Sequence, residues 1–443
     1  MRPNIIFVFT DDQDLHLGSL DYMSSVKNEL AAKGTTFSNH FATVSQCCPS
    51  RASLLRGQHA HNTNNTFVSA PGGNYAKWLA SGENNDYLPM WLSKAGYRTE
   101  YIGKFLNGYN SALYMNQPKG WDIADILVDP WTYQYNTPVF SQNGRIPILY
   151  RGYHQTDVIR AKTMSRLEYL TDKQDKPFYL TIAPVSPHVE IRGLPVPLAR
   201  HAKGFPNATA PQGRNFNPSD ALTAQKPSWL KDLPLMKDTD ISRANDHFRH
   251  RIRALQGVDE IVQDVVDFLD RKKLLNNTYI IYSSDNGYHL GQHRVNAGKT
   301  LPYIEDSNLP FIVRGPNVPA GKSSRLPGTH IDLAPTFLDI ACLEKKQYPV
   351  YLDGRSLLNN WHYPTQPTDD SNTCDIINIE FWGKGEIEAR GKNGSDKNSY
   401  KTLRVVSEKN SWLYSKWCTG DRELYNTQAR YQLSLAKRVA ANR

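Results

Sequence analysis

The chain has 443 residues, of which 39% are hydrophobic and 21% charged, and its formal net charge is +9. Because a single core stops growing at about 250–300 residues, this length favours one large domain with a smaller second one. No apolar run reaches the roughly 20 residues of a membrane span. The basic residues are dispersed, so the charge favours a small or polymeric anionic substrate over nucleic acid, although a basic surface kept for solubility explains it equally well.

Four apolar runs along the chain end abruptly in polar, chemically capable residues, and each run predicts a buried strand. The runs are Ile5–Phe9, Thr99–Ile102, Phe178–Ile182 and Tyr279–Tyr282. Helical periodicity fills intervals between them, over Val158–Tyr169 and Ser242–Arg271. Continuous apolar strands alternating with helices are typical of a parallel sheet covered on both faces, where ligands bind beyond the carboxyl ends of the strands. We therefore expect the active site at that edge.

Two later regions differ from this alternation. Arg192–Pro234 is rich in Pro, Gly, Asn and Ala, which predicts a long surface loop near the catalytic face. After about residue 365 the chain changes to short β-prone runs and a final helix, the runs being Ile376–Trp382, Leu403–Ser407 and Trp412–Trp417. The sequence thus predicts a catalytic α/β domain over residues 1–365 and a small antiparallel, β-rich subdomain with a terminal helix over 366–443.

Oxygen-bearing side chains follow two of the predicted strands. Asp11 and Asp12 come after the first strand, and Asp285 and Asn286 follow the last. Carboxylate and amide oxygens are the ligands that calcium or magnesium prefers. Either pair alone is more simply explained as turn and helix-cap residues, but two such pairs after buried strands favour a metal site.

The run from Cys47 to Gly57 reads Cys-Cys-Pro-Ser-Arg-Ala-Ser-Leu-Leu-Arg-Gly. It resembles the signature of type I sulfatases, Cys-x-Pro-Ser-Arg followed by a short helix and Gly. The segments Pro3–Asp12 and Ser284–His289 also resemble blocks of that family in order and spacing. The double cysteine is similar to the form in N-acetylglucosamine-6-sulfatases, extracellular heparan endosulfatases and fungal arylsulfatases, and Asp11–Leu15 is most similar to the last group.

This resemblance implies an alkaline-phosphatase-like α/β sandwich that hydrolyses sulfate esters. In the family an accessory formylglycine-generating enzyme oxidises the first cysteine of the signature, here Cys47, to formylglycine. A thiol would form a stable thiosulfate, whereas an aldehyde hydrate has one hydroxyl to attack sulfur and a second to expel sulfate. The resemblance also implies one Ca²⁺ beside residue 47, held by Asp11, Asp12, Asp285 and Asn286.

Four further residues match family positions. Arg51 would hold the hydrate and offset its developing negative charge. Lys104 and Lys299 match the two lysines that bind sulfate oxygens, although isolated lysines are usually just solvated surface. His188 matches the histidine near the leaving-group oxygen, so that either it or Lys299 protonates the departing alcohol. The expected substrate is an aryl sulfate or a sulfated sugar.

One position departs from the family pattern. Many sulfatases carry a histidine at the second position after the lysine that Lys104 matches, and the corresponding stretch here leads to Asn107 without one. Asn107 cannot replace that histidine as a proton acceptor, so His289 is expected to serve as the base, with His293 as the second candidate.

Two other functions fit the same residues. A related phosphate or phosphonate monoester hydrolase needs similar metal and cation arrangements, although phosphate monoesters commonly recruit two metals. The other alternative is a catalytically silent binder of sulfated glycans in which Cys47 is never converted. The full set of signature and ligand residues favours the active sulfatase over both.

The secretory pathway is the expected location. Four Asn-x-Ser/Thr sites lie at Asn64, Asn207, Asn276 and Asn393. The opening residues lack the charged and apolar regions of a signal peptide. Among the five cysteines, Cys374 and Cys418 are a first candidate for a disulfide in an oxidising compartment, although sequence does not fix the pairing.

Overall fold

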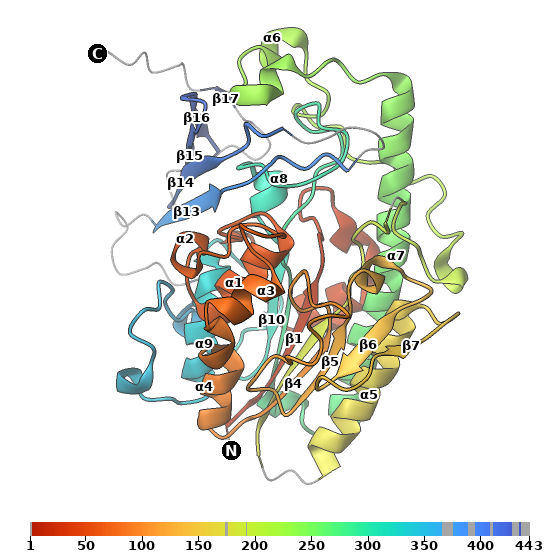
Figure 1. Cartoon of the computed structure of the whole chain (residues 1–443), viewed down its shortest axis with the longest axis vertical. Helices are drawn as coiled ribbons and strands as arrows, with labels where there is room; N and C mark the ends of the chain where they lie inside the picture. The colour runs from red at the N-terminus through yellow and green to blue at the C-terminus, as the bar shows by residue number, and fades with distance from the viewer. Residues whose placement is uncertain are drawn as a thin grey trace.

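The described residues form a sheet of ten strands and a sheet of five (Figure 1). The strands β3 (His40–Phe41) and β12 (Gly328–Thr329) form a third sheet of two strands. In this computed structural model the described residues are 2–172, 176–191, 193–365, 375–388, 395–407, 411–427 and 434–435. The large sheet has the strand order β11-β2-β10-β9-β1-β8-β4-β5-β6-β7. Its size and mostly parallel centre confirm the predicted fold class.

The four predicted strands lie side by side at the centre of the large sheet, in parallel. They are β1 (Asn4–Thr10), β4 (Arg98–Gly103), β8 (Phe178–Ala183) and β9 (Thr278–Ser284). Every residue of β1, β8 and β9 is buried, which explains their continuous apolar runs. Because the strands are parallel, their carboxyl ends meet at one edge.

Shorter strands extend the sheet on both sides. β5 (Ile123–Leu127) continues it in parallel, and β6 (Val139–Gln142) and β10 (Phe311–Arg314) pair antiparallel. The outer strands are β2 (Thr35–Phe37), β11 (Lys322–Ser324) and β7 (Ile148–Leu149).

Helices cover both faces of the large sheet (Figure 1). On one face, α5 (Gln155–Asp172) and α7 (Asp238–Arg271) pack against Ile6 and Val8. The opposite face, with Ile5 and Phe7, is covered by α1 (Cys47–Arg56), α4 (Leu88–Lys94) and α9 (Leu333–Ile340). The side chains of β1 thus alternate between two cores.

The helices α5 and α7 begin earlier than the apolar periodicity predicts. The first turn of α7 contains Asp238 and Asp240, and the Asp240 carboxylate accepts a hydrogen bond from Lys237 N at 3.1 Å. This polar turn is stabilised by capping and charge rather than by burial, so it carries no hydrophobic signal.

The region after Ile191 forms only short helical turns in its described part: η5 (Ala199–His201), α6 (Asp220–Thr223) and η6 (Ser228–Asp232). Exposed, half-buried and buried residues are mixed along this region without a regular period. Phe216 pairs with Gln292 in an isolated bridge. The position agrees with the expected surface loop, and its role in substrate access stays a prediction.

The C-terminal sheet is antiparallel, with the order β13-β14-β15-β16-β17. Its strands are β13 (Asp375–Phe381), β14 (Tyr400–Val406), β15 (Ser411–Trp417), β16 (Arg422–Asn426) and β17 (Ser434–Leu435). Buried and exposed residues alternate along β14 and β15, as in a sheet with one wet face. The buried face packs with Phe41 and Tyr303 of the catalytic region.

The predicted terminal helix is wrong for Ser434 and Leu435, which extend the sheet by pairing with Asn426 and Tyr425. The pairing satisfies backbone groups at the edge of β16 that a helix would leave open. The rest of that prediction, together with Cys374 and Asn393, lies outside the described residues. The division at residue 365 stays a prediction.

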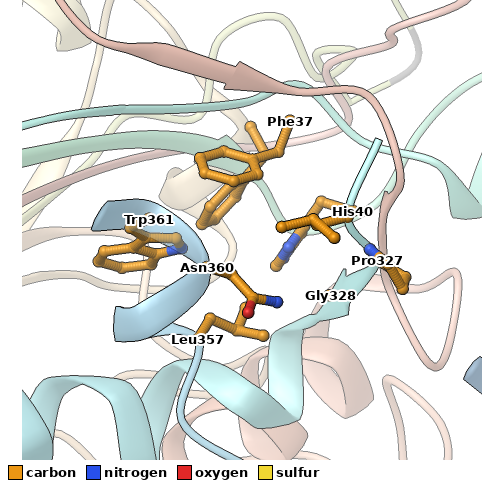
Figure 2. A pocket seen from close by; sticks show the side chains of 9 residues that line it. Phe37, His40, Pro327, Gly328, Leu357, Asn360 and Trp361 are labelled. Atoms are coloured by element: carbon orange, nitrogen blue, oxygen red, sulfur yellow. The ribbon is translucent and has the colours of Figure 1, made fainter. Parts of the chain in front are cut away.

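A small cavity lies between β2, β10 and α10 (Leu358–His362), lined by Phe37, His40 and Trp361 among others (Figure 2). Its volume is about 10 Å³, room for one water and too little for a sulfate ester. His40 bonds His330 at 3.0 Å, and His330 reaches the carbonyl oxygen of Ser284 at 2.7 Å. These rings support the end of β9 just before Asp285.

Candidate active site

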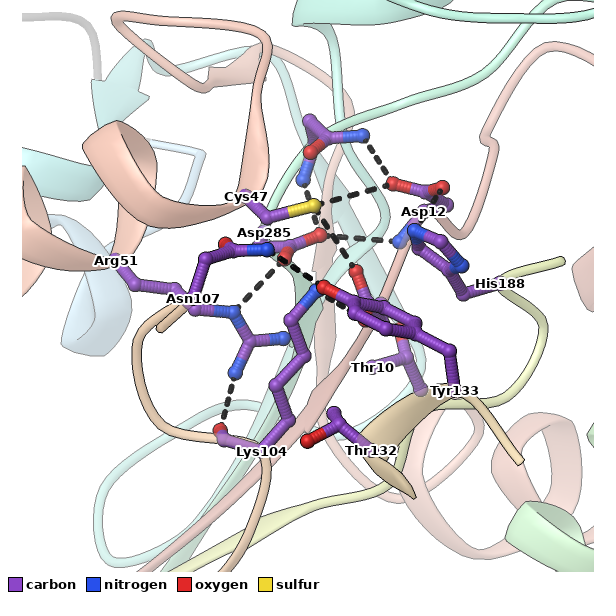
Figure 3. A network of polar contacts seen from close by, with 12 residues as sticks. Thr10, Asp12, Cys47, Arg51, Lys104, Asn107, Thr132, Tyr133, His188 and Asp285 are labelled. Carbon is purple, nitrogen blue, oxygen red and sulfur yellow. Dashed lines mark hydrogen bonds and ion pairs between the residues drawn. The ribbon is translucent and has the colours of Figure 1, made fainter. Parts of the chain in front are cut away.

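The ends of the four central strands bring charged side chains into one buried cluster (Figure 3). Asp11 and Asp12 follow β1, Lys104 follows β4, and Asp285 follows β9. His188 lies in the turn after β8, beyond the cis bond between Ser186 and Pro187. Residues separated by more than 270 positions in the sequence therefore face one another.

The acidic residues share a network of short contacts. Asp285 Oδ1 accepts hydrogen bonds from the backbone N–H groups of Asp12, at 3.0 Å, and Asn286, at 2.8 Å. Asn286 Nδ2 donates to Asp12 Oδ1 at 2.8 Å. Asp12 has a φ of 63°, a left-handed conformation that turns the chain so that its carboxylate enters the cluster.

Arg251 holds this turn from behind. It is fully buried on α7 and donates to the carbonyl oxygen of Asp12 and, at 2.9 Å, to Asp14 Oδ1. Neither Arg251 nor Asp14 is predicted as a site residue from the sequence. The only signal was a charged residue on the apolar side of a predicted helix.

Cys47 begins the helix α1, directly after the extended residue Gln46. Its Sγ lies 3.4 Å from Asp11 Oδ1 and 3.2 Å from Lys299 Nζ. Burial raises the pKa of the Cys47 thiol, and Asp11 raises it further. The neighbouring Cys48 points elsewhere, with its Sγ 3.5 Å from Asn65 Oδ1. Only the first cysteine of the pair belongs to the cluster.

Arg51 lies one helical turn after Cys47 and links two strand ends. Its Nε binds Asp285 Oδ2 at 2.8 Å, and its Nη1 donates to the carbonyl oxygen of Lys104 at 2.6 Å. Its guanidinium lies over the ring of Phe9, 4.9 Å from the centroid. Among the described residues its buried Nη2 has no hydrogen-bond partner, which leaves one donor for a bound anion.

Two lysines and a histidine complete the predicted set. Lys104 Nζ binds Asp11 Oδ2 at 2.5 Å, and Lys299 Nζ binds the two carboxylate oxygens of Asp12 at 2.7 and 2.8 Å. His188 Nε2 lies 3.5 Å from Asp12 Oδ2. Ligand atoms of Asp11, Asp12, Cys47 and His188 all lie within 4.8 Å of one another.

The charged groups of the cluster shift the pKa values of its carboxyl groups in opposite directions. Burial raises the pKa of Asp11, but Lys104, His188 and Arg51 outweigh burial and hold that pKa below its usual value. For Asp285, burial and Asp11 raise the pKa to about 6, against the opposing effect of Arg51. Three carboxyl groups this close favour a positive partner, which the lysines supply in part.

The residues also fit a metal ion. Asn286 Oδ1 is buried and has no hydrogen-bond partner within the described chain, beside three carboxylates. An oxygen-only donor set of this kind suits a hard divalent cation. His188 adds a nitrogen within 4.8 Å of the ligand oxygens of Asp11 and Asp12, and its ring packs on Tyr133, with 4.6 Å between centroids.

The two candidate bases lie in different surroundings. His289 Nδ1 contacts Asp306 Oδ1 at 2.7 Å, and its buried Nε2 has no partner among the residues described. Its backbone pairs with Gly298, next to Lys299. His293 instead contacts Glu305 at 3.3 Å and packs on Tyr303, and burial lowers its pKa to about 4. The structure thus brings His289, rather than His293, toward the lysine.

Asn107 has a partner that the sequence did not suggest. Its Nδ2 donates to the hydroxyl oxygen of Tyr133 at 2.6 Å, and the ring of Tyr133 lies 5.0 Å from Lys104 Nζ. Tyr133 belongs to the short turn η4 (Trp131–Tyr133), which has no motif of its own.

Two acidic residues that follow β13, and that are not predicted from the sequence, also lie near the cluster. Glu386 and Glu388 lie 4.0 and 3.7 Å from Lys299 Nζ. Gln46 Nε2 donates to Glu386 Oε1 at 2.5 Å. Burial raises the pKa of Glu386, and Lys299 opposes that effect. The alternating Gly and Glu residues of this segment carry no recognisable signal.

This sheet, with an oxygen cluster and cations at its carboxyl edge, has the alkaline-phosphatase-like α/β fold. A protein solved in complex with its substrate D-glucosamine-2-N,6-O-disulfate superposes with a TM-score of 0.74 at 23% identity, over 97% of this chain and 92% of that one. A phosphonate monoester hydrolase from Silicibacter pomeroyi superposes with a TM-score of 0.64 at 18% identity, over 98% and 90%. These likenesses show the fold.

Sequence comparison is more specific. The profile of the sulfatase family matches residues 3–342. An arylsulfatase of Volvox carteri is 38% identical over 463 residues, which cover 96% of this chain and 70% of that protein. An N-acetylglucosamine-6-sulfatase of Homo sapiens is 33% identical over 393 residues, 87% of this chain and 68% of that protein. The chain belongs to the sulfatase family and is a sulfuric ester hydrolase, as the signature predicted.

Proposed function

We propose that this sulfatase cleaves sulfate monoesters with a formylglycine formed from Cys47, beside one Ca²⁺ held by Asp11, Asp12, Asp285 and Asn286. The observation that carries the proposal is the position of Cys47. Its Sγ lies at the start of α1 within 3.4 Å of Asp11 Oδ1 and 3.2 Å of Lys299 Nζ. Residue 47 therefore adjoins both the oxygen ligands and a cation.

The chain's own residues would bind and orient the sulfate. Lys104 binds Asp11 and Lys299 binds Asp12, so each ammonium group lies within hydrogen-bond distance of a ligand carboxylate and both can reach sulfate oxygens. Arg51 offers its Nη2, which has no hydrogen-bond partner in the described part of the chain, while Asp285 and the carbonyl of Lys104 fix the guanidinium plane. Donors held in this way stabilise charge that develops in the transition state. When present, the cation would withdraw charge from sulfate and the formylglycine hydrate would supply the attacking hydroxyl.

The same geometry supports two proposed proton transfers. His188, 3.5 Å from Asp12 and at the rim of the cluster, is the proposed acid that protonates the departing alcohol, with Lys299 as the alternative. His289 is the proposed base for the expulsion of sulfate. Asp306 binds its Nδ1, which leaves Nε2 as the nitrogen that accepts a proton. His293, with its own carboxylate partner, has no part in this proposal.

The proposed substrates are aryl sulfates or sulfated sugars. The names of the relatives support both classes, since some are arylsulfatases and others are N-acetylglucosamine-6-sulfatases. A fold neighbour holds a sulfated glucosamine.

We further propose that the protein matures in the secretory pathway, where a formylglycine-generating enzyme modifies Cys47. Asn64, Asn207 and Asn276 are exposed, as glycosylation requires. Two relatives are called extracellular sulfatases, from Drosophila melanogaster and Caenorhabditis elegans. Within the described residues, no helix has the length and apolar character to cross a membrane.

Mass spectrometry of the tryptic peptide that contains Cys47 tests the proposal, on protein from a host that installs formylglycine. We expect the mass loss of a thiol replaced by an aldehyde, together with hydrolysis of 4-nitrophenyl sulfate. An unmodified thiol with retained affinity for sulfated polymers would instead identify a silent binder. Faster turnover of 4-nitrophenyl phosphate than of the sulfate would identify a phosphoesterase.

A further inference from the structure

The segment Gly383–Glu388 reaches the site from beyond residue 365, where the sequence predicts that the catalytic domain ends. It follows β13 and lies beyond residues 3–342, the part that matches the family profile. The family profile therefore does not specify which residues stand here. Their contacts with Lys299 nevertheless place them beside the proposed sulfate position.

Backbone contacts fix this segment against the loop that carries Lys299. Glu386 N donates to Thr300 Oγ1 at 3.1 Å, and Glu388 N donates to the carbonyl oxygen of Ala297 at 2.9 Å. A Cβ on Gly298 would lie 2.5 Å from the carbonyl oxygen of Glu386, so glycine permits the close approach. The main chain thus fixes the segment against the loop of Lys299, and side-chain donors hold the carboxylates: Gln46 Nε2 donates to Glu386 Oε1, and the hydroxyl of Tyr288 donates to Glu388 Oε2.

The two carboxylates flank the ammonium group that also contacts Cys47. Lys299 Nζ lies 3.2 Å from Cys47 Sγ, 4.0 Å from Glu386 and 3.7 Å from Glu388. Their side chains are 26% and 15% exposed, whereas that of Lys299 is 2% exposed. The carboxylates are thus more exposed than the ammonium group that they flank, so an alcohol that extends from the proposed sulfate position toward solvent on this side would meet them.

Gln46 adds an independent sign of a ligand. It is fully buried next to Cys47, and its Nε2 donates to Glu386 Oε1. Its Oε1 is buried without a hydrogen-bond partner in the described part of the chain. A buried amide oxygen without a partner is costly, and a hydroxyl or ammonium donor on a ligand would satisfy it.

We propose that Glu386, Glu388 and Gln46 form a subsite for the alcohol of the ester, and that it selects alcohols that are neutral or carry an ammonium group. All three side chains offer acceptors, which bind hydroxyl and ammonium donors. A second anionic group near the scissile sulfate would lie against two carboxylates and be repelled. The subsite thus favours glucosamine 6-sulfate with a free amine over its 2-N,6-O-disulfate. This inference rests on the proposed function.

Competition between these two sulfated glucosamines tests the subsite. We expect the full-length wild-type protein to prefer the monosulfate by about 10-fold or more in kcat/KM, and Glu388→Gln and Glu386→Gln each to reduce that preference by about 3- to 10-fold, because each removes one repelling charge. Asp396→Asn is the matched control. Asp396 is exposed and pairs with Lys384 at 2.8 Å, so this variant removes one charge from a nearby part of the chain and should keep the wild-type preference.

Binding of the two product alcohols separates this inference from the proposed function. Calorimetric titration with glucosamine and with N-sulfoglucosamine needs no turnover, and we expect the same order of preference. Equal binding of both by the wild type, or a preference unchanged in both Gln variants that still hydrolyse 4-nitrophenyl sulfate, would overturn the subsite. A wild type that hydrolyses no sulfate ester but shows the binding preference would overturn the proposed function and retain the subsite.

Discussion

The ten-stranded sheet and the five-stranded C-terminal sheet differ in how their residues are buried and in where their strands end. The large sheet is buried on both faces, and its four central parallel strands end at one edge where acids and cations meet. The C-terminal sheet is antiparallel, with an alternating pattern along β14 and β15, and its strands run in opposite directions. The carboxyl ends of parallel strands lie together at one edge, whereas those of antiparallel strands are divided between two edges. The large sheet therefore forms the site, and the C-terminal sheet adds to it only through the segment Gly383–Glu388 that follows β13.

This contrast implies that substitutions at the edge of the large sheet change chemistry, whereas substitutions within the C-terminal sheet change stability. The largest expected effect is that of Cys47→Ala, which should reduce kcat for 4-nitrophenyl sulfate by about 10⁴-fold or more, because it removes the nucleophile. Cys48→Ala is the control, since Cys48 faces Asn65. A comparable loss of kcat in Cys48→Ala would mean that substitution of either cysteine lowers activity by disturbing the fold.

Arg51→Lys should have the next largest effect. Arg51 binds Asp285 and the carbonyl of Lys104 together and still offers Nη2, which one ammonium group cannot reproduce. We expect kcat/KM to fall by about 10²- to 10³-fold with the far-ultraviolet circular dichroism unchanged. Activity within a factor of three of the wild type would show that Arg51 only balances charge.

Leu413→Ala examines the other side of the comparison. Leu413 is fully buried in β15 and packs in the core shared with Phe41 and Tyr303. We expect a loss of about 2–4 kcal/mol in the free energy of unfolding, measured with urea, from lost contacts and a cavity. The kcat of the folded fraction should stay unchanged. Lys416→Ala, at an exposed position of the same strand, is the control. A large loss of kcat in Leu413→Ala would break the contrast.

The smallest effect concerns Glu100, in the middle of β4. Burial raises its pKa to about 8, which Arg166 opposes, and both carboxyl oxygens lack hydrogen-bond partners among described residues. The native state therefore binds a proton that the unfolded chain releases near pH 4.5, so stability falls as pH rises between these values. Glu100→Gln should gain about 1–2 kcal/mol relative to the wild type at pH 8.5 and nothing at pH 5.

Denaturant unfolding at both pH values measures this difference. Glu100 lies on the large sheet but away from its polar edge, so the substitution should leave kcat unchanged. An equal effect of the substitution at pH 5 and pH 8.5 would show that Glu100 is ionised in the folded protein.

The sequence was informative where burial and chemistry coincide along one segment. The four central strands were predicted because every position faces a core, and the polar residues after them because they interrupt apolar runs. The signature around Cys47 added specificity. Arg251, Tyr133 and Glu388 were not predicted because each comes from an element whose local pattern says nothing of the strand ends that it meets in the fold.

Cys47 is only 2% exposed, and on the proposed function this burial fixes whether its oxidation comes before or after folding. On the proposed chemistry, an enzyme must hold the segment around Cys47 in its own active site, and α1 packed under Leu333 and Phe337 does not allow that. Oxidation must therefore precede the docking of α1. Maturation and folding compete in time, and a molecule that folds first is trapped as an inactive thiol form. The yield of active enzyme is then a kinetic quantity, which slower folding or more converting enzyme would raise.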